Sequence, residues 1–581
     1  MASSVTTDSA AGAMSARGYG ASPPQGRIER AADAVDRNAV WVLAGLMVLA
    51  GAMLLYMGRE LTFYFDEWEW IAKDYGGGIH TLLVAHVGNI SVFPVIVYKI
   101  LFHLVGLDHY EVFRLAVIVL HLICGLLIYL LAVPRIGRVP GLLAATLILF
   151  LGAAWEDLLW AFQVGYLLSV SGGLATWFLL ERRRRWTDVA AMLCLVVSAG
   201  SSSLGIAVMV GIGVELAWRR EMRRMWIFLI PAALYALWYL AYGESQVTEA
   251  SLVAAPGFAE DLAASAFGGL AGRGLDWGRP LALAGALILV WRLVRGERIS
   301  ARLASLVAAA IALWVVTAVA RSTISPPEAS RYIYLGAVLI VLIGVELLRG
   351  VEITARACAV ASGLVLICVI TGVTILHNGA GGLRATSQTV AAEVGAMELA
   401  AVYAPPEYRP DPVRSPQIFA GSYLHTVRAI GSSAGDTPAE IAAANSSSRD
   451  AADSVLLALL SPKLEPLGVG RSSRLAPAPA TLAVVGGISE QHASCTLLTP
   501  SVHRSMVAEL ALPSGGITIN NLGSAPASIA LKRFGETFDP VSTPAAPHAV
   551  SKLVLPTDRA STGWQAQLVS SAQLATCGLR P

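Results

Sequence analysis

The chain has 581 residues, of which 55% are hydrophobic and 14% are charged, and its mean hydropathy is +0.62. Soluble globular domains carry about 25% charged residues, so this composition predicts a polytopic membrane protein. The net charge of +2 excludes a nucleic-acid partner that is recognised by bulk charge.

The N-terminal residues 1–26 are rich in Ala, Ser and Gly, which predicts a disordered segment. We expect residues 1–38 as a whole to form a disordered cytoplasmic N-terminus. No apolar run precedes the one at 39–58, so that run is predicted to be a retained signal anchor rather than a cleavable signal peptide.

Eleven apolar runs follow one another, and most have about the length that crosses a bilayer as a helix. The runs are 39–58, 113–132, 139–153, 160–180, 187–201, 203–217, 226–242, 280–294, 304–320, 333–348 and 357–376. The fifth and sixth runs are short, and they form either two short spans or one re-entrant pair. Residues 39–376 are therefore predicted to form one transmembrane domain.

Arginine clusters lie before the first run and in alternate connections thereafter. The clusters are Arg27, Arg30 and Arg37; Arg135 and Arg138; Arg182 to Arg185; Arg219, Arg220, Arg223 and Arg224; Arg295, Arg298 and Arg302; and Arg349 and Arg356. The positive-inside rule makes the face that they share cytoplasmic. The opposite face then receives the loops 59–112, 152–159, 243–279 and 321–332 and everything after residue 377. We expect a multi-pass protein of a bacterial-type plasma membrane, with its chemistry on the outer face.

The C-terminal region after residue 377 lacks a spanning run. Residues 377–480 are predicted to be a mainly helical extracytoplasmic linker region, and residues 481–581 show short β-like runs between Gly, Pro, Asn and Asp. This pattern predicts a small β-sandwich, stapled by Cys495 and Cys577 if they pair in an oxidising compartment. Such a domain either binds glycan or acts as a structural cap. The expected fold is a polytopic α-helical membrane protein of about eleven transmembrane helices with a C-terminal extracytoplasmic α+β domain.

An acidic cluster, Phe65-Asp66-Glu67-Trp68-Glu69, opens the first outer loop. Carboxylates are costly in lipid, so the cluster belongs at the membrane surface or in a wet cavity. A carboxylate there can accept a proton from a hydroxyl nucleophile. The alternative is a helix N-cap with interfacial charges.

Further along the same loop, His86 and Asn89 lie just before an apolar run. They are candidates to orient a sugar, or to bind a divalent metal ion together with Asp66. The alternative for a lone histidine is an ordinary hydrogen-bonded residue. A divalent metal is thus the candidate cofactor, with Asp66 and His86 as its ligands if there is one.

Two further motifs flank later runs. Trp155-Glu156-Asp157 opens a run that carries Gln163, a polar residue whose alternative role is an interhelical hydrogen bond. Arg331-Tyr332 leads into another run at its outer end, where an arginine departs from the positive-inside trend. It is a candidate clamp for a phosphate, or else a snorkelling interfacial arginine. The chain has no P-loop, which argues against ATP-driven transport.

Taken together, these motifs and their order resemble integral-membrane glycosyltransferases of the GT-C fold, such as the protein mannosyltransferase, aminoarabinose transferase and arabinofuranosyltransferase groups. The resemblance covers roughly residues 39–376 and implies a donor that is a polyprenyl-phosphate sugar. It also implies an acceptor on the outer face, which is an envelope glycan, lipid or protein, and inversion of the anomeric centre.

Carried over to this chain, the resemblance assigns residue roles. Asp66 looks like the general base, with Glu67 as the second catalytic carboxylate. Arg331, Arg321 and Tyr332 would bind the donor phosphate. The residues expected to position donor and acceptor are His86, Asn89, Trp155, Glu156, Asp157 and Gln163.

Two other function classes remain open. A transporter or flippase for a lipid-linked glycan predicts ionisable residues near mid-membrane and internal repeats, whereas the charges here lie at the ends of the runs. A non-catalytic assembly factor for lipid-linked envelope glycans predicts that Asp66 can be replaced without loss.

Overall fold

The computed structural model describes residues 27–74, 77–86, 88–295, 299–467, 477–555 and 562–579. The predicted disorder of residues 1–26 falls outside these ranges. Residues 27–37, assigned from composition to the same disordered terminus, instead form helix α1 (Arg27–Arg37). Its alanines favour a helix, and Glu29 in the first turn and Arg37 in the last turn complement the helix dipole.

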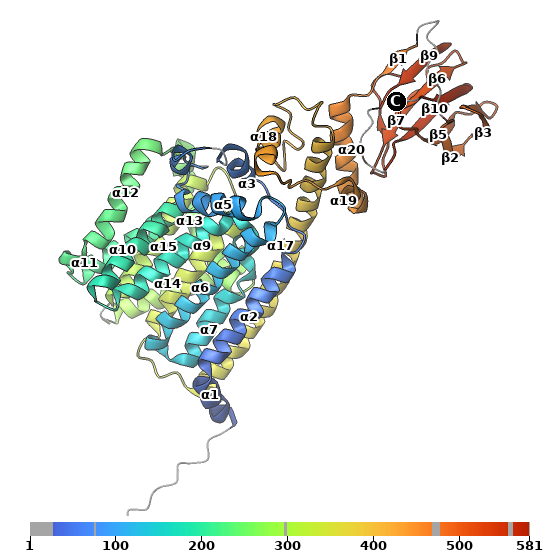
Figure 1. Ribbon diagram of the computed structural model, residues 1–581. Coiled ribbons are helices and arrows are strands. Elements are labelled where there is room, and N and C mark those ends of the chain that lie inside the picture. Colours follow the sequence, from blue (N-terminus) through green and yellow to red (C-terminus); the bar gives the residue numbers. More distant parts are fainter. Residues whose placement is uncertain are drawn as a thin grey trace, which may run out of the picture.

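Each predicted apolar run overlaps largely with one helix of the described chain, although several runs extend a few residues beyond it. The helices are α2 (Ala39–Met57), α6 (Tyr110–Ile136), α7 (Arg138–Leu149), α9 (Val164–Leu180), α10 (Arg185–Ser201), α11 (Gly205–Trp218), α12 (Trp226–Tyr242), α14 (Leu275–Val294), α15 (Ala301–Arg321), α16 (Ile333–Leu347) and α17 (Ala355–Leu399). The protein is therefore helical and polytopic in the manner of a membrane protein (Figure 1).

Fewer than the eleven expected spans meet a strict criterion of helix length and apolar composition among the described residues. Among the described residues, seven segments are long and apolar enough to cross a membrane: Ala39–Met57, Tyr110–Ile136, Arg138–Leu159, Ala161–Leu180, Ala301–Arg321, Ser330–Leu347 and Ala355–Leu399. Helices α11 and α12 are apolar but shorter. At 1.5 Å per residue they reach about 21–26 Å, which is less than the hydrocarbon core of about 30 Å.

Two segments that the sequence placed in loops are helical. The loop 59–112 contains α5 (Val92–Val105), an apolar helix too short to meet the spanning criterion. The loop 243–279 contains α13 (Glu249–Leu270), which packs on α14, α15 and α16. Its sequence does not form a continuous apolar run, because Pro256 and several acidic residues interrupt the pattern.

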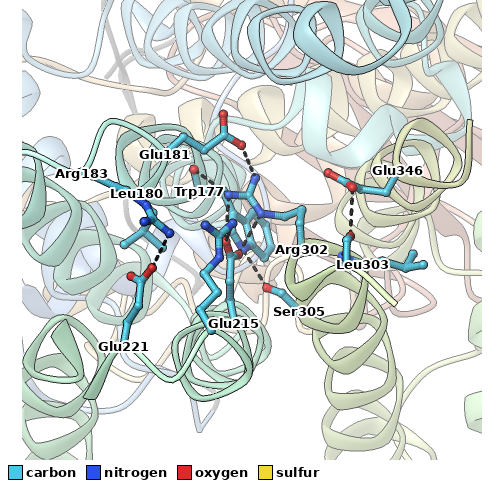
Figure 2. Close-up of polar contacts among 12 residues, drawn as sticks. Trp177, Leu180, Glu181, Arg183, Glu215, Glu221, Arg302, Leu303, Ser305 and Glu346 are labelled. Carbon is cyan, nitrogen blue, oxygen red and sulfur yellow. Dashed lines mark hydrogen bonds and ion pairs between the residues drawn. The ribbon is translucent and has the colours of Figure 1, made fainter. Parts of the chain in front are cut away.

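A largely buried network of charged side chains joins the helices at one end of the bundle. Arg302 donates to Glu215 at 2.8 Å and lies 3.1 Å from Glu181 (Figure 2). Arg135 bonds to the same Glu181 at 2.5 Å and also to Glu346. These carboxylates are the partners that buried arginines require. The network ties together α6, α11, α15, α16 and the end of α9.

Helix α17 is long enough to leave the membrane and carry the C-terminal region. Its 45 residues extend about 68 Å at 1.5 Å per residue, roughly twice the hydrocarbon thickness. Figure 1 shows its C-terminal half projecting beyond the bundle, where it meets the helices α18 (Ala420–Ile430), α19 (Pro438–Ala443) and α20 (Ser446–Leu460). Helix α20 packs along α17.

The C-terminal end is a strand-rich domain of two antiparallel sheets. One sheet has the order β1 (Leu464–Pro466), β9 (Ala549–Leu553), β6 (Ile517–Asn521), β11 (Leu574–Gly578), β4 (Cys495–Pro500) and β3 (Gly487–His492). The other has the order β2 (Ala480–Val485), β5 (Met506–Ala511), β10 (Gln565–Ser570), β7 (Ser528–Lys532) and β8 (Asp539–Pro540). Buried and partly buried residues alternate along β5 and β10, as expected for strands with one face in a core.

A disulfide and a set of backbone contacts hold this domain. Cys495 and Cys577 face each other on β4 and β11 and form a disulfide. The carboxylate of Asp453 on α20 accepts hydrogen bonds from the backbone N–H groups of Arg533, Phe534 and Gly535 at 2.7, 3.0 and 2.8 Å. The strand domain is thereby coupled to α20 and, through α20, to α17.

Candidate functional site

A cavity of about 300 Å³ lies at the end of the bundle opposite the charge network. The first loop, the start of α9, the break between α10 and α11, the end of α15 and the turn η5 (Ser330–Tyr332) form its wall. Its lining residues are Tyr64, Phe65, Asp66, Trp70, His86, Asn89, Ser91, Pro94, Glu156, Trp160, Phe162, Gln163, Gly165, Tyr166, Ser201, Ser202, Arg321, Ile324, Arg331 and Tyr332. The structure thus brings together eight of the predicted site residues: Asp66, His86, Asn89, Glu156, Gln163, Arg321, Arg331 and Tyr332.

Asp66 reaches this cavity because the chain turns sharply just before it. Phe65 has a φ of +47°, a left-handed conformation that costs a non-glycine residue about 1–3 kcal/mol and persists only where the surroundings impose it. Asp66 precedes the short helix α3 (Glu67–Glu69), but its side chain makes no capping hydrogen bond. Asp66 thus occupies the N-cap position without capping the helix, and its carboxylate lines the cavity.

The surroundings of Asp66 make its carboxylate more basic than usual. Burial raises the pKa of Asp66 to about 6, and the neighbouring carboxylate of Glu69 adds to the rise, whereas Arg331, Arg321 and His86 oppose it. A carboxyl group with such a pKa is mostly ionised at neutral pH and still basic enough to take up a proton.

Glu67 is fully buried and does not line the cavity. Its carboxylate accepts hydrogen bonds from the backbone N–H of Tyr64 at 2.8 Å, the indole of Trp160 at 2.9 Å and the phenol of Tyr110 at 3.0 Å, and also from Tyr98. Burial raises the pKa of Glu67 to about 7, against the effect of these hydrogen bonds. The side chain thus connects the turn before Asp66 to α5, α6 and the segment just before α9.

His86 and Asn89 are held in a tight turn. Their backbones exchange two hydrogen bonds of 2.9 Å each, and Gly88 between them has a φ of +74°, which favours glycine. The Nδ1 atom of His86 lies 3.7 Å from a carboxylate oxygen of Glu69. Both side chains of the turn face the same cavity as Asp66.

The described lining of the cavity does not contain the three protein ligands that are typical of a catalytic zinc site. Within the described ranges, no group of three or more His, Cys, Asp or Glu side chains is arranged to hold one. Asp66 and His86, the two expected ligands, both line the cavity, and a catalytic zinc site usually has a third protein ligand.

Glu156 and Arg331 form an ion pair in the cavity wall. The backbone N–H of Arg331 donates to one oxygen of Glu156 at 3.0 Å, and its guanidinium donates to the other at 3.1 Å. Ser330 locks this corner, because its hydroxyl accepts from the N–H of Glu156 and donates to the carbonyl of Ala153. The guanidinium also lies 5.3 Å from the ring of Tyr332. The arginine is thus oriented before any ligand binds.

A second cavity of about 420 Å³ adjoins the first. It lies among α11, α12 and α15 and is lined mainly by apolar side chains. The two cavities share the lining residues Asn89, Tyr166, Ser202, Arg321 and Tyr332. Arg321, at the C-terminal end of α15, is therefore a cation at the junction between a polar and an apolar space.

Of Gln163, Asp157 and Trp155, which were also predicted to belong to the site, only Gln163 lines the cavity. The carbonyl oxygen of Gln163 is buried without a hydrogen-bond partner among the described residues. Asp157 is buried inside α8 (Trp155–Leu159) and does not reach the cavity. Trp155 faces α17 instead, where it packs against Gly379 and borders a separate groove of about 440 Å³.

Several residues of the site are not among those assigned to it from the sequence. Tyr64, Trp160 and Phe162 add an aromatic wall, and Ser202 lies in the polar break between two apolar runs. Gln417 donates a hydrogen bond of 3.0 Å to Asp66 from a loop far along the chain. The serine break and the aromatic residues flanking the motifs are visible in the sequence, whereas nothing local to Gln417 points to Asp66.

Comparison with solved structures finds distant similarity in structure. No family model matches the chain, and no curated protein matches its sequence. The crystal structure of ArnT from Cupriavidus metallidurans bound to undecaprenyl phosphate is similar at a TM-score of 0.43 and 14% sequence identity, over 67% of this chain and 84% of that one.

Proposed function

We propose that the protein is a membrane glycosyltransferase that moves a sugar from a polyprenyl-phosphate donor to an extracytoplasmic acceptor. The observation that carries this proposal is the pair of adjoining cavities, one polar with Asp66 in its wall and one apolar, with Arg321 at their junction. Such an arrangement suits an amphiphile whose sugar, phosphate and isoprenoid chain need a polar pocket, a cation and an apolar groove in that order.

In the proposed reaction, Asp66 acts as the general base. It takes the proton of an acceptor hydroxyl while that oxygen attacks the anomeric carbon of the donor sugar. The bond from this carbon to the phosphate oxygen breaks, and the polyprenyl phosphate leaves with the bonding electron pair. An in-line attack inverts the anomeric centre. The pKa of Asp66, raised by burial to about 6, suits this role.

The two cavity arginines have complementary tasks in this proposal. Arg321 and Arg331 stabilise the charge that develops on the departing phosphate. Glu156 orients Arg331 through the contacts at 3.0 and 3.1 Å, and Tyr332 lies beside both cavities. A preoriented guanidinium loses less conformational entropy when it binds phosphate.

The other predicted residues divide into two groups. His86, Asn89 and Gln163 line the polar cavity, where we assign them to the hydroxyl groups of the sugar or acceptor. Glu67 has a positioning role, because its carboxylate is already occupied by four hydrogen-bond donors. The proposal gives Asp157 and Trp155 no contact with substrate.

The proposed sidedness rests on the arginines. Arg182, Arg184 and Arg185 lie exposed near the end of α9, at the opposite end of the bundle from the cavity. The positive-inside rule assigns that end to the cytoplasm and the cavity to the outer side. The C-terminal helices and the strand domain are then extracytoplasmic, where a disulfide can form.

The test uses the purified full chain in lipid vesicles. Labelled polyprenyl-phosphate pentoses and hexoses are incubated with an envelope fraction, and transfer of label to the acceptor is measured. We expect Asp66→Asn to lower the rate about 10²–10⁴-fold while binding of undecaprenyl phosphate is retained. The matched control is Asp108→Asn, an exposed carboxylate of the same loop.

Donor binding is measured separately, with undecaprenyl phosphate as the probe. Arg331→Ala should weaken binding and turnover together, and Arg331→Lys should rescue only part because an ammonium cannot form the same fork of hydrogen bonds. Arg428→Ala, an exposed arginine of α18, is the matched control. Full transfer by Asp66→Asn, or movement of the labelled donor across vesicles without any transfer, would contradict the proposal.

A further inference from the structure

The helical region after α17 docks on the first loop through α18. The hydroxyl of Thr426 donates to the backbone carbonyl of Ile71 at 3.3 Å. The ring of Tyr423 meets that of Trp68 edge to face, with their centroids 5.7 Å apart. All four residues are buried. The C-terminal region therefore shares a packed interface with the segment that begins at Asp66.

Gln417 lies on a loop just before α18 that is braced on both sides. Ser415 and Ile418 are buried, and the N–H of Ile418 donates to the carbonyl of Ser415 at 3.1 Å. The same loop is tied to α17 by Arg414, whose guanidinium lies 2.7 Å from the carboxylate of Glu393. The position of the Gln417 side chain is thus set by the scaffold rather than by a free loop.

The amide of Gln417 contacts the proposed base directly. Its Nε2 atom donates to Oδ1 of Asp66 at 3.0 Å. An ionised carboxylate only accepts hydrogen bonds, so the amide must present its NH₂ group to Asp66. This bond occupies one carboxylate oxygen and leaves the second available for an acceptor hydroxyl. A hydrogen bond of this kind also favours the charged form of the acid.

We propose that Gln417 is a positioning residue for Asp66, so that the C-terminal helical region completes the site of the transmembrane domain. The inference rests on the proposed function, in which Asp66 is the base. Gln417 aims one oxygen of that base and keeps the carboxylate ionised at a lower pH than burial alone would allow.

Other charged groups act on Asp66 from several elements, and the test must separate them from Gln417. Glu69 follows it in α3, and His86 lies in the same loop. Arg321 at the end of α15 and Arg331 in η5 face it across the cavity. A substitution at Gln417 leaves all four in place.

Three substitutions of Gln417 are expected to move the acid limb of the pH profile, two of them to higher pH and one to lower pH. Gln417→Ala removes the donor, so the acid limb of the pH profile should move up by about 0.5–1 pH unit. Gln417→Glu places a second carboxylate against the first, and the limb should move up by about 1 unit or more. Gln417→Lys supplies a cation, and the limb should move down by about 1 unit. Damage to folding cannot produce shifts of opposite sign.

Two readouts on the full chain in lipid vesicles follow these shifts. The first is the pH dependence of kcat/KM for sugar transfer. The second is modification of Asp66 by a carbodiimide, which reacts with the protonated acid, measured by peptide mass spectrometry across the same pH range. The second readout does not depend on the proposed activity.

Two control variants distinguish the effect of the Gln417 amide from the effect of the packing of α18 on the first loop. Gln388→Ala removes an exposed amide of α17 that bonds to Asn445 at 2.9 Å, and it should leave both readouts unchanged. Thr426→Val removes a docking hydrogen bond without touching Asp66, and it should leave the midpoint of the acid limb where it is.

The outcomes distinguish this inference from the proposed function. If Asp66→Asn is inactive but the titration midpoint of Asp66 is unchanged in all three Gln417 variants, the inference about Gln417 is wrong and the proposed function still stands. An equal shift in Thr426→Val and Gln417→Ala would also overturn it, because docking and not the amide would then set the titration of Asp66. Full transfer by Asp66→Asn would remove the base itself, and the proposed function would fall with the inference.

Discussion

Arg331 is bound twice by Glu156, through its backbone N–H at 3.0 Å and through its guanidinium at 3.1 Å. An arginine expected to hold a phosphate is therefore held by a carboxylate before any ligand arrives. Because the backbone takes part, the pair fixes both the turn η5 and the direction of the side chain.

The first prediction concerns this pair. Glu156→Ala removes both contacts, so Arg331 loses its orientation and undecaprenyl phosphate should bind about tenfold more weakly, a change equivalent to about 1.4 kcal/mol. Ser330→Ala, which loosens the same corner, should have a smaller effect in the same direction. Glu111→Gln, an exposed carboxylate of α6, is the control. Tighter binding by Glu156→Ala would mean that Glu156 competes with the phosphate for Arg331.

The second prediction links the pKa of Asp66 to stability. Its pKa is raised in the folded protein from 3.8 to about 6, so folding is favoured while the group is protonated and loses this contribution as pH rises from about 4 to 6. Asp66→Asn removes the buried charge and should stabilise the protein by about 1–3 kcal/mol at pH 7.5. The midpoint temperature of unfolding should rise at pH 7.5 and stay unchanged at pH 4. A drop at pH 7.5 would show that the charge is well compensated where it lies.

The third prediction separates the two adjacent carboxylates. Glu67→Gln keeps the shape of a side chain that only holds its neighbours, so part of the transfer rate should survive, whereas Asp66→Asn should leave almost none. Glu67→Ala strands several buried donors and should destabilise the fold by about 3–5 kcal/mol. Thermal unfolding and transfer assays on the same preparations measure both effects. Equal inactivation by the two isosteric variants would argue that Glu67 takes part in the chemistry.

The fourth prediction concerns sidedness. Ala439→Cys, exposed in α19, should react with a membrane-impermeant maleimide in intact cells, and Arg184→Cys should react only after lysis. The protein with its native cysteines gives the background. The reverse pattern would invert the orientation and move the proposed chemistry to the cytoplasm.

The fifth prediction concerns the strand domain. Asp453→Ala leaves the buried N–H groups of Arg533, Phe534 and Gly535 without their acceptor and should cost about 2–4 kcal/mol. Limited proteolysis should then release the strand domain faster than in the unchanged protein. Asp450→Ala breaks more exposed contacts to the same loop and should have a weaker effect. Unchanged proteolysis in Asp453→Ala would show that other contacts hold the domain.

The sequence by itself determined the class of the protein and the places of its helices. Each of the eleven apolar runs overlaps largely with a helix, because the hydropathy of a segment depends only on its own residues. The two helices that the sequence placed in loops, α5 and α13, do not meet the hydropathy criterion, each for its own reason. One is too short to meet the criterion, and the other carries a proline and acidic residues that only its packing on α14, α15 and α16 compensates.

The sequence motifs lie beside the ends of apolar runs. Eight of their residues line one cavity, because these ends meet at one end of the helix bundle. Only the tertiary structure decided which of two adjacent carboxylates faces that cavity, because the strained turn at Phe65 and the four donors around Glu67 come from separate segments. The tertiary structure alone also shows the contact of Gln417 with Asp66, two residues that lie 351 positions apart in the sequence. A hydrogen bond between such distant side chains depends on how whole elements pack, and no local pattern records it.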